Sequence, residues 1–348
     1  MDKINVLVTG AGGGGIGEQV IKCLGLSELN THIIATDISN ISKGKLDGDE
    51  FIVAPLATNP SYINFIIDLC KEKKVTAVIP GSEIELKLLS ENEQIFTENN
   101  IAVLINSASV IKTCLDKNLT AKFLLENGFL SPKSFTIRSE KDLEAIDKFP
   151  VVLKPSVGGG GSVNTLIAQT KEELNAFGKF LLSQYEEFIA QEYIGDAENE
   201  YTVGVLSTAE GIIIDSIVLR RNILSGLGAK IKILNKSGNT NLGKYLAISS
   251  GISQGEIIRN ELIASQAEKI AQNLKSTGPL NIQCRLHEGK VYVFEINPRF
   301  SGTSPMRAIA GFNELDLSLK NKVLKQKEFK RLNYKLGHLV RGLTEFFI

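Results

Sequence analysis

Two segments of alternating polar and apolar residues, joined by a short glycine-containing turn, constrain this chain more than any other feature. The segments cover 281–287 and 292–299, with Glu288-Gly289-Lys290 between them. Glycine readily supplies the positive φ that a tight turn needs, so we predict an antiparallel hairpin. With a loop of odd length, alternate side chains form one apolar face, and a slip of one residue would scramble it. The predicted apolar face consists of Ile282, Cys284, Leu286, Tyr292, Phe294 and Ile296.

The opposite face of the predicted hairpin gathers polar side chains. Gln283, Glu295 and Asn297 share it, with Gln283 opposite Glu295, and Arg299 follows two residues after Asn297. Amide and carboxylate oxygens beside a cation are the groups that a magnesium–nucleotide phosphate site requires. Taken alone, the segment could also be an edge hairpin with a solvated polar face.

Composition bounds the class of protein. The 348 residues exceed one ordinary core, so we expect two or three domains. The 39 basic and 39 acidic residues balance, which leaves no global field to attract nucleic acid or an anionic membrane. Four scattered cysteines form no CxxC pair, and no apolar run approaches the roughly 20 residues needed to span a bilayer. We therefore expect a cytoplasmic protein with no zinc site and no nucleic-acid or membrane partner.

The first 110 residues alternate predicted strands and helices, which is typical of an open parallel sheet. A glycine cluster, Gly10–Gly15, follows the strand at 4–8, and Asp37 ends the next strand. This arrangement resembles a dinucleotide-binding fingerprint and would suit NAD. The alternative is a tight strand-to-helix connection without a ligand, and the remaining sequence contains no recognisable hydride-transfer chemistry.

A lysine and a second glycine cluster follow in the middle of the chain. Lys154 ends the apolar strand 151–155, and the loop Gly158-Gly159-Gly160-Gly161-Ser162 comes next. A lysine can reach phosphate oxygens as a point charge while glycine N–H groups close over them. No Gly-Lys-Ser/Thr follows, so this is not a Walker motif, and a mobile surface loop is the alternative.

Three further features are weak by themselves. Glu192-Tyr193-Ile194, at the end of a predicted strand, could contact an adenine edge, and Glu200 could accept ribose hydroxyls, although a charged strand rim explains both. Lys117 lies early in a predicted helix, where most lysines are solvated. We predict loops over a cleft for 222–253 and an amphipathic helix for 256–274.

The order of these elements is more specific than any one of them. The elements are, in sequence, Lys117, Lys154, the glycine loop, Glu192–Ile194, Glu200, Gln283 and Glu295-Ile296-Asn297-Pro298-Arg299. Because of this order, the chain resembles the ATP-grasp superfamily. It looks most like stand-alone relatives of the carbamoyl-phosphate synthetase large subunit and the carboxylate–amine ligases. The resemblance implies an α/β protein with an α+β carboxyl-terminal part: a Rossmann-like domain at 1–110, a small lid subdomain at 111–187 and a large subdomain at 188–348.

The resemblance also implies cofactors and roles. ATP and Mg²⁺, with Mn²⁺ possible, would be the cofactors. The phosphates would be held by Lys117, Lys154 and Gly158 to Ser162. Glu192 and Ile194 would offer backbone contacts to adenine, with Tyr193 between them also in the cofactor site, and Glu200 would bind ribose. Gln283, Glu295 and Asn297 would coordinate the metal, while Arg299 and Lys154 would act in catalysis.

The implied activity is ATP-dependent formation of a C–N bond between a small carboxylate and an amine through an acyl phosphate, in a possible homodimer. The synthetase has another arginine three residues after the one matching Arg299, and Gly302 stands there in this chain. Phosphorylation of a small carboxy compound in the manner of that synthetase, and a non-catalytic nucleotide- or NAD-binding protein, are the alternatives. Candidate substrate residues for a carboxylate are Arg221, Arg299 and Arg307, with the region Lys230–Lys232 closing over it. Glu83 and Glu85 could hold an amine, and structural ion pairs compete with most of these roles.

Overall fold

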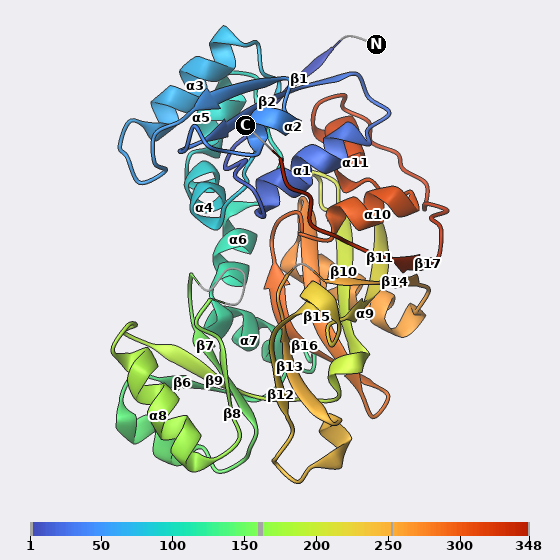
Figure 1. Ribbon diagram of the computed structural model, residues 1–348. Coiled ribbons are helices and arrows are strands. Elements are labelled where there is room, and N and C mark those ends of the chain that lie inside the picture. The colour runs from blue at the N-terminus through green and yellow to red at the C-terminus, as the bar shows by residue number, and fades with distance from the viewer. Residues whose placement is uncertain (1–2, 159–162, 252, 347–348) are drawn as a thin grey trace.

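The computed structural model describes residues 3–158, 163–251 and 253–346. Over these residues the chain forms a five-stranded, a four-stranded and a six-stranded sheet and one two-stranded ribbon. Figure 1 shows the amino-terminal sheet at the top, the four-stranded lid sheet at the lower left and the six-stranded sheet at the right. The combination of a parallel sheet with antiparallel sheets confirms the predicted α/β class with an α+β carboxyl-terminal part.

The amino-terminal sheet is parallel, with strand order β3-β2-β1-β4-β5, as the alternation predicted. Its central strands are apolar and buried because helices cover both faces. Its elements are β1 Ile4–Val8, α1 Ile16–Gly25, β2 Thr31–Asp37, α2 Gly44–Asp47, β3 Glu50–Val53, α3 Tyr62–Glu72, β4 Ala77–Ile79, α4 Glu83–Glu91, α5 Glu93–Glu98 and β5 Ala102–Val103.

The lid sheet has the order β6-β9-β7-β8 and packs on α8, where the Thr170 side chain caps the helix by accepting from the Glu173 N–H. Two helices precede it, at 108–115 and 117–126. The second packs on the large sheet, while the first packs on both the large sheet and the amino-terminal core. The expected lid bounds of 111–187 stay a prediction. These elements are α6 Ala108–Leu115, α7 Lys117–Glu126, β6 Ser134–Ile137, η1 Glu140–Ala145, β7 Val151–Pro155, β8 Leu166–Ala168, α8 Lys171–Leu182 and β9 Phe188–Glu192.

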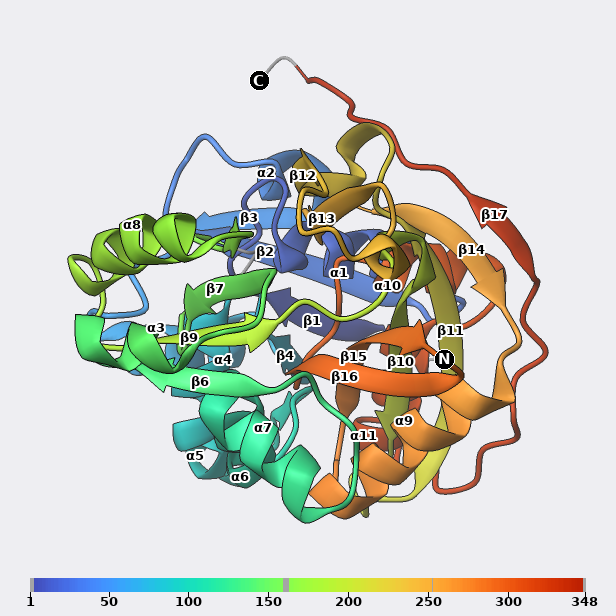
Figure 2. The ribbon, with the colours of Figure 1, turned by 90° about the horizontal axis from the view of Figure 1, so that it is seen from below.

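The large sheet is antiparallel over β16-β15-β10-β11-β14-β17, with α9 against one face (Figure 2). The prediction of loops for 222–253 was wrong in part, since β12 and β13 pair there. The predicted helix at 256–274 begins only at Glu261, because the preceding residues pair with β11 and Asn260 caps the helix. The elements are η3 Ala197–Asn199, β10 Glu200–Ser207, β11 Ile213–Asn222, η4 Gly226–Gly228, β12 Ala229–Leu234, η5 Thr240–Leu242, β13 Tyr245–Ser249, β14 Gln254–Ile258, α9 Glu261–Leu274, β15 Pro279–His287, β16 Lys290–Asn297, α10 Ser304–Ala310, α11 Glu314–Lys322 and β17 Gly337–Leu339.

The hairpin of β15 and β16 forms as predicted, and Gln283 pairs with Glu295, but one prediction about its faces was wrong. Glu288 and Gly289 both have positive φ, so the turn has two residues rather than three. A β-bulge then restores the register between Gln283 and Cys284. Between turn and bulge the sides are exchanged: Val291 and Val293 enter the core, while Tyr292 and Phe294 line a pocket.

Candidate nucleotide and metal site

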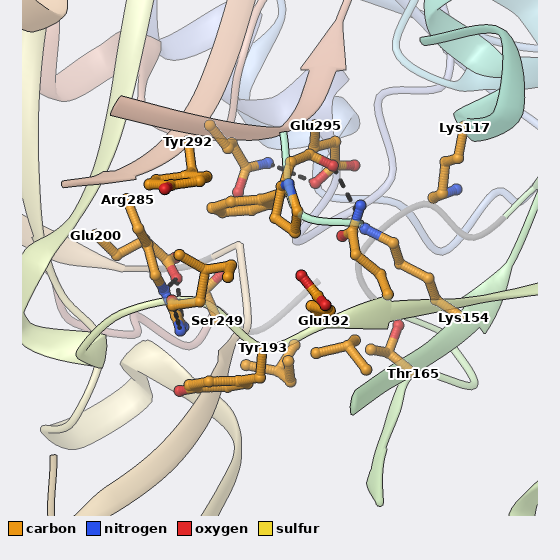
Figure 3. Close-up of a pocket in the computed structure, with 17 residues that line it drawn as sticks. Lys117, Lys154, Thr165, Glu192, Tyr193, Glu200, Ser249, Arg285, Tyr292 and Glu295 are labelled. Carbon is orange, nitrogen blue, oxygen red and sulfur yellow. Dashed lines mark hydrogen bonds and ion pairs between the residues drawn. The ribbon is translucent and has the colours of Figure 1, made fainter. Parts of the chain in front are cut away.

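A pocket lies between the lid sheet and the large sheet. Apolar side chains from both sheets form much of its wall, and charged groups lie at its two ends. Figure 3 shows Lys117 and Lys154 at one end, Glu200 and Arg285 at the other, and Glu295 between them. Its lining residues are Lys117, Pro132, Val152, Lys154, Thr165, Gln191, Glu192, Tyr193, Ile194, Glu200, Ile248, Ser249, Gln283, Arg285, Tyr292, Phe294 and Glu295.

The lysine end of the pocket holds two cations, of which Lys154 is buried and Lys117 is half-buried. Lys154 is 8% exposed, and its Nζ donates to the Phe294 carbonyl at 3.4 Å. Burial lowers the pKa of Lys154 to about 8, although the nearby Glu295 carboxylate opposes that shift. Lys117 begins α7, and its backbone N–H donates to the Ser156 carbonyl at the start of the glycine loop. Two cations therefore converge where phosphates could bind.

Of the glycine loop at 158–162, the structure describes only Gly158. Gly158 has φ of +74° and lines a second cavity next to the pocket. The predicted phosphate-binding residues Gly159, Gly160, Gly161 and Ser162 lie outside the described residues.

The strand end at Glu192-Tyr193-Ile194 borders the apolar part of the pocket. The Tyr193 N–H donates to Pro150, and the tyrosine hydroxyl donates to the Ala247 carbonyl and accepts from the Ala247 N–H. The Ile194 carbonyl accepts from Arg285. The Ile194 N–H donates to no carbonyl of the described chain.

Glu200 is 2% exposed and lies between two arginines. Arg221 donates to its Oε1 at 3.1 Å, while Nε and Nη2 of Arg285 donate to its Oε2 at 3.1 and 3.0 Å. The Arg285 guanidinium also lies 4.3 Å from the centre of the Tyr193 ring. Two cations around one carboxylate leave a net positive charge at this end of the pocket.

Arg285, Tyr292 and Phe294 were not among the candidate site residues. Arg285 was accessible to sequence reasoning, because strand alternation places it on the same face as Gln283. Tyr292 and Phe294 were assigned to the wrong face, since nothing local in the sequence reveals the bulge.

The predicted metal ligands gather where β15 and β16 pair. Gln283 Oε1 accepts from Arg221 at 2.8 Å and Gln283 Nε2 donates to Glu295 Oε2 at 2.9 Å. Arginine only donates and an ionised carboxylate only accepts, so these neighbours fix the orientation of the amide. Gln283 thus joins the arginine to the glutamate, with one lone pair of its oxygen left for a metal.

Glu295 and the adjoining residues suit a hard cation. Asn297 Oδ1 accepts from Arg299 at 3.1 Å, and the Glu295 Oε1 atom has no hydrogen bond to any other described residue. The described residues hold no group of three His, Cys, Asp or Glu side chains that could bind a metal ion alone. A magnesium ion at Glu295 would therefore share protein oxygens with phosphate oxygens, as it commonly does.

The second cavity, of about 870 Å³, opens beside the metal-ligand strand end and reaches the amino-terminal domain. Glu83, at the start of α4, lies 3.5 Å from Arg299 across the domain boundary. Arg221 also lines this cavity, with its guanidinium bound to Glu200, Gln283 and Ser253.

Two candidate substrate residues, Arg307 and Glu85, make structural interactions within the protein. Arg307 is 0% exposed, pairs with Glu314 at 3.0 Å and lines none of the described cavities. Glu85 accepts from the Tyr62 hydroxyl at 2.7 Å and from Ser82 beneath the amino-terminal sheet edge. The functional groups of both residues are therefore occupied by partners within the protein.

Close packing and positive φ explain part of the first glycine cluster. A Cβ atom on Gly10 would lie 2.6 Å from Glu85 Oε2 and one on Gly12 would lie 2.9 Å from Asp37 Oδ2, while Gly14 has φ of +82°. The Glu18 carboxylate accepts from the Gly14 N–H at 2.6 Å, where a pyrophosphate oxygen would otherwise bind. This geometry favours a tight strand-to-helix connection over NAD binding.

Comparisons with known proteins agree with this architecture. Residues 6–104 match the family "PylC-like, N-terminal domain", and residues 243–345 match "ATP-grasp in the biosynthetic pathway with Ter operon". The carbamoyl phosphate synthase large chain of Caldanaerobacter subterraneus subsp. tengcongensis is 27% identical over 97% of this chain. This chain spans only 30% of that relative's length. No described helix is long and apolar enough to cross a membrane.

Two solved structures share the fold. The N5-carboxyaminoimidazole synthetase from Staphylococcus aureus complexed with ADP matches 95% of this chain and 80% of its own, with a TM-score of 0.65 and 14% identity. The L-amino acid ligase from Bacillus licheniformis matches 92% of this chain and 74% of its own, with a TM-score of 0.64 and 16% identity.

Proposed function

We propose that this chain, a member of the ATP-grasp superfamily, is an ATP-dependent carboxylate–amine ligase that releases ADP and phosphate. The observation that carries the proposal is the convergence of Lys154 from the lid and Glu295 from the large sheet on one pocket. A cation for phosphates and a hard anionic metal ligand on opposite walls are what bound Mg-ATP requires.

The pocket suggests how ATP would bind. The adenine would lie against apolar side chains such as Phe294, with its edge near the Ile194 N–H, and the ribose would point toward Glu200. The phosphates would extend toward Lys117 and Lys154 under the glycine loop. Glu200 already accepts from two arginines, so a ribose hydroxyl would share its oxygens with them.

Magnesium would bind Glu295 and Asn297, with the Gln283 oxygen as a further ligand, and would neutralise charge on the phosphates. A substrate carboxylate oxygen attacks the γ-phosphorus, the bond to ADP breaks, and an acyl phosphate forms. An amine nitrogen then attacks the acyl carbon, phosphate leaves and the amine loses a proton. A free carboxylate is a poor electrophile, so the ATP supplies the leaving group.

The protein's own groups position and neutralise these reactants. Arg299 is held by Asn297 and by the Phe300 carbonyl, 2 residues from a proposed metal ligand, and would face the transferring phosphoryl group. Closure of the lid would exclude water, because an acyl phosphate hydrolyses. This chain has Gly302 where the carbamoyl-phosphate synthetase pattern has an additional arginine, and this difference favours an organic carboxylate over bicarbonate as the substrate.

The test is release of ADP and phosphate from Mg-ATP in the presence of pooled amino acids and carboxylic acids, with bicarbonate and glutamine as a separate pool. ADP formation that depends on an organic carboxylate and an amine would support the ligase. Formation only with bicarbonate would favour the carbamoyl-phosphate type of reaction, and formation of AMP would reject an acyl phosphate.

Two variants in the pocket and one control variant outside it test whether this pocket catalyses the turnover of ATP. Glu295→Ala and Lys154→Ala should each abolish turnover, whereas Glu288→Ala, at an exposed turn residue, should leave it unchanged. Turnover near the wild-type rate in either of the first two variants would contradict the proposed site.

A further inference from the structure

The carboxyl-terminal segment forms one wall of the large cavity. β17 pairs with the edge strand β14, and residues 341–346 then run to the amino-terminal domain, the dark-red trace in Figures 1 and 2. Near its end, Phe346 lies under Lys43, whose Nζ is 4.7 Å from the ring centre. The parts of the chain that line the cavity include the glycine turn at 13–15, the strand end with Asn297 and Arg299, and this segment.

Arg341 is the cation that the segment brings to this cavity. Its Nη2 donates to the Gly302 carbonyl at 2.6 Å, and its backbone N–H donates to Gln254 Oε1 at 3.3 Å. No carboxylate of the described chain lies within 4 Å of it in an ion pair. Burial lowers its pKa, against the opposing effect of Glu18, so its charge is incompletely compensated.

The other cations that line the cavity have carboxylate partners. Arg221 pairs with Glu200 at 3.1 Å, Arg299 with Glu83 at 3.5 Å, and Lys22 with Glu18 at 2.6 Å. Lys43 pairs with Glu18 and Asp47. Of these cations, Arg341 alone has no ion pair with an acid of the described chain, so its donors are the ones most open to a negatively charged ligand in the cavity.

The absence of a side chain at Gly302 accompanies the binding of the Arg341 guanidinium to this loop. A Cβ atom there would lie 3.0 Å from the Gly251 carbonyl oxygen, so a side chain at this position would press on the opposite loop. The guanidinium reaches the loop after Arg299 from a distant part of the sequence instead. Arg341 lines the same cavity as the residues that we propose to hold the metal and the phosphoryl group, which are Glu295, Asn297 and Arg299.

We propose that Arg341 binds a carboxylate group of the substrate in this cavity, which makes the carboxyl-terminal segment part of the substrate site. This inference rests on the proposed ligase function, since that function makes the cavity a substrate site. A guanidinium can meet a carboxylate through two parallel hydrogen bonds, and partial burial strengthens such a pair. Arg341→Lys would keep the charge but lose the paired geometry.

The experiment measures binding without turnover. The thermal unfolding midpoint is followed with Mg-ADP while L-alanine, L-glutamate, succinate or inorganic phosphate is titrated. At least one carboxylate should raise the midpoint of the wild type. Its half-saturating concentration should rise about 10- to 100-fold in Arg341→Gln and less in Arg341→Lys. Arg138→Gln, at an exposed ion pair in the lid, is the matched control and should behave as the wild type.

Affinity for Mg-ADP checks that the variants are folded, and it should not change in Arg341→Gln. An unchanged carboxylate titration in Arg341→Gln would overturn the proposal, as would a wild type that responds to none of the carboxylates. A response to phosphate alone would also overturn it. Arg341-dependent carboxylate binding without carboxylate-dependent ADP formation would remove the proposed function while leaving Arg341 as a carboxylate-binding residue.

Discussion

Replacement of Lys154 by methionine is expected to stabilise the protein at neutral pH while abolishing turnover. Burial lowers the pKa of Lys154 from the usual 10.5 to about 8, with Glu295 opposing the change and Lys117 adding to it. Each pH unit corresponds to about 1.4 kcal/mol, so keeping this ammonium charged in the folded protein costs on the order of 3 kcal/mol. Methionine has a similar length and no charge, so the variant should recover up to that amount.

The stability gained in Lys154→Met should depend on pH, in a direction that follows from the lowered pKa of Lys154. Because the pKa of Lys154 is lower in the folded than in the unfolded chain, the unfolded chain binds the extra proton between about pH 8 and 10.5. The contribution of Lys154 to the free energy of unfolding should therefore become less unfavourable as the pH rises through this window. The advantage of Lys154→Met is fully present below about pH 8 and should shrink above it.

Urea denaturation followed by far-UV circular dichroism, near neutral pH and near the upper end of that window, measures the effect. Lys179→Met, at a lysine whose side chain is 61% exposed, is the control and should change stability little. Loss of ADP release in Lys154→Met shows that the stabilised protein has lost its phosphate ligand. The reasoning would be refuted if Lys154→Met were no more stable than the wild type, or if its advantage were independent of pH.

Three other substitutions test the surrounding structure. Arg285→Ala leaves Glu200 with one cationic partner in place of two, and urea denaturation should show a loss of about 3 kcal/mol or more; a loss below about 1 kcal/mol would contradict the buried network. Arg307→Ala breaks a fully buried ion pair and should lower the thermal midpoint, yet the protein that remains folded should keep the wild-type KM for the carboxylate, and a raised KM would restore Arg307 as a substrate ligand. Gly81→Ala would place a Cβ atom 2.1 Å from the Thr9 carbonyl oxygen, so the amino-terminal domain should be strongly destabilised in thermal unfolding, and an unchanged midpoint would contradict this close packing.

The hairpin of β15 and β16 shows how much of its structure the local sequence pattern predicts. Alternation and the glycine turn predicted both strands and the pairing of Gln283 with Glu295. The same reasoning placed Tyr292 and Phe294 in the core, because the two-residue turn and the bulge shift the register twice and cancel at the metal end. A pattern of period two cannot reveal two compensating shifts.

The sequence by itself determined the parallel amino-terminal sheet, the order of the elements and the group of Lys154, Glu200 and Glu295. These depend on local periodicity, turn chemistry and motif order, which the chain carries in its own sequence. Only the tertiary structure decided which charges meet. It enclosed Glu200 between two arginines, removed Arg307 into an ion pair with Glu314 and brought Arg341 to the large cavity. Contacts between residues far apart in the sequence depend on how whole sheets pack, and no local pattern records that packing.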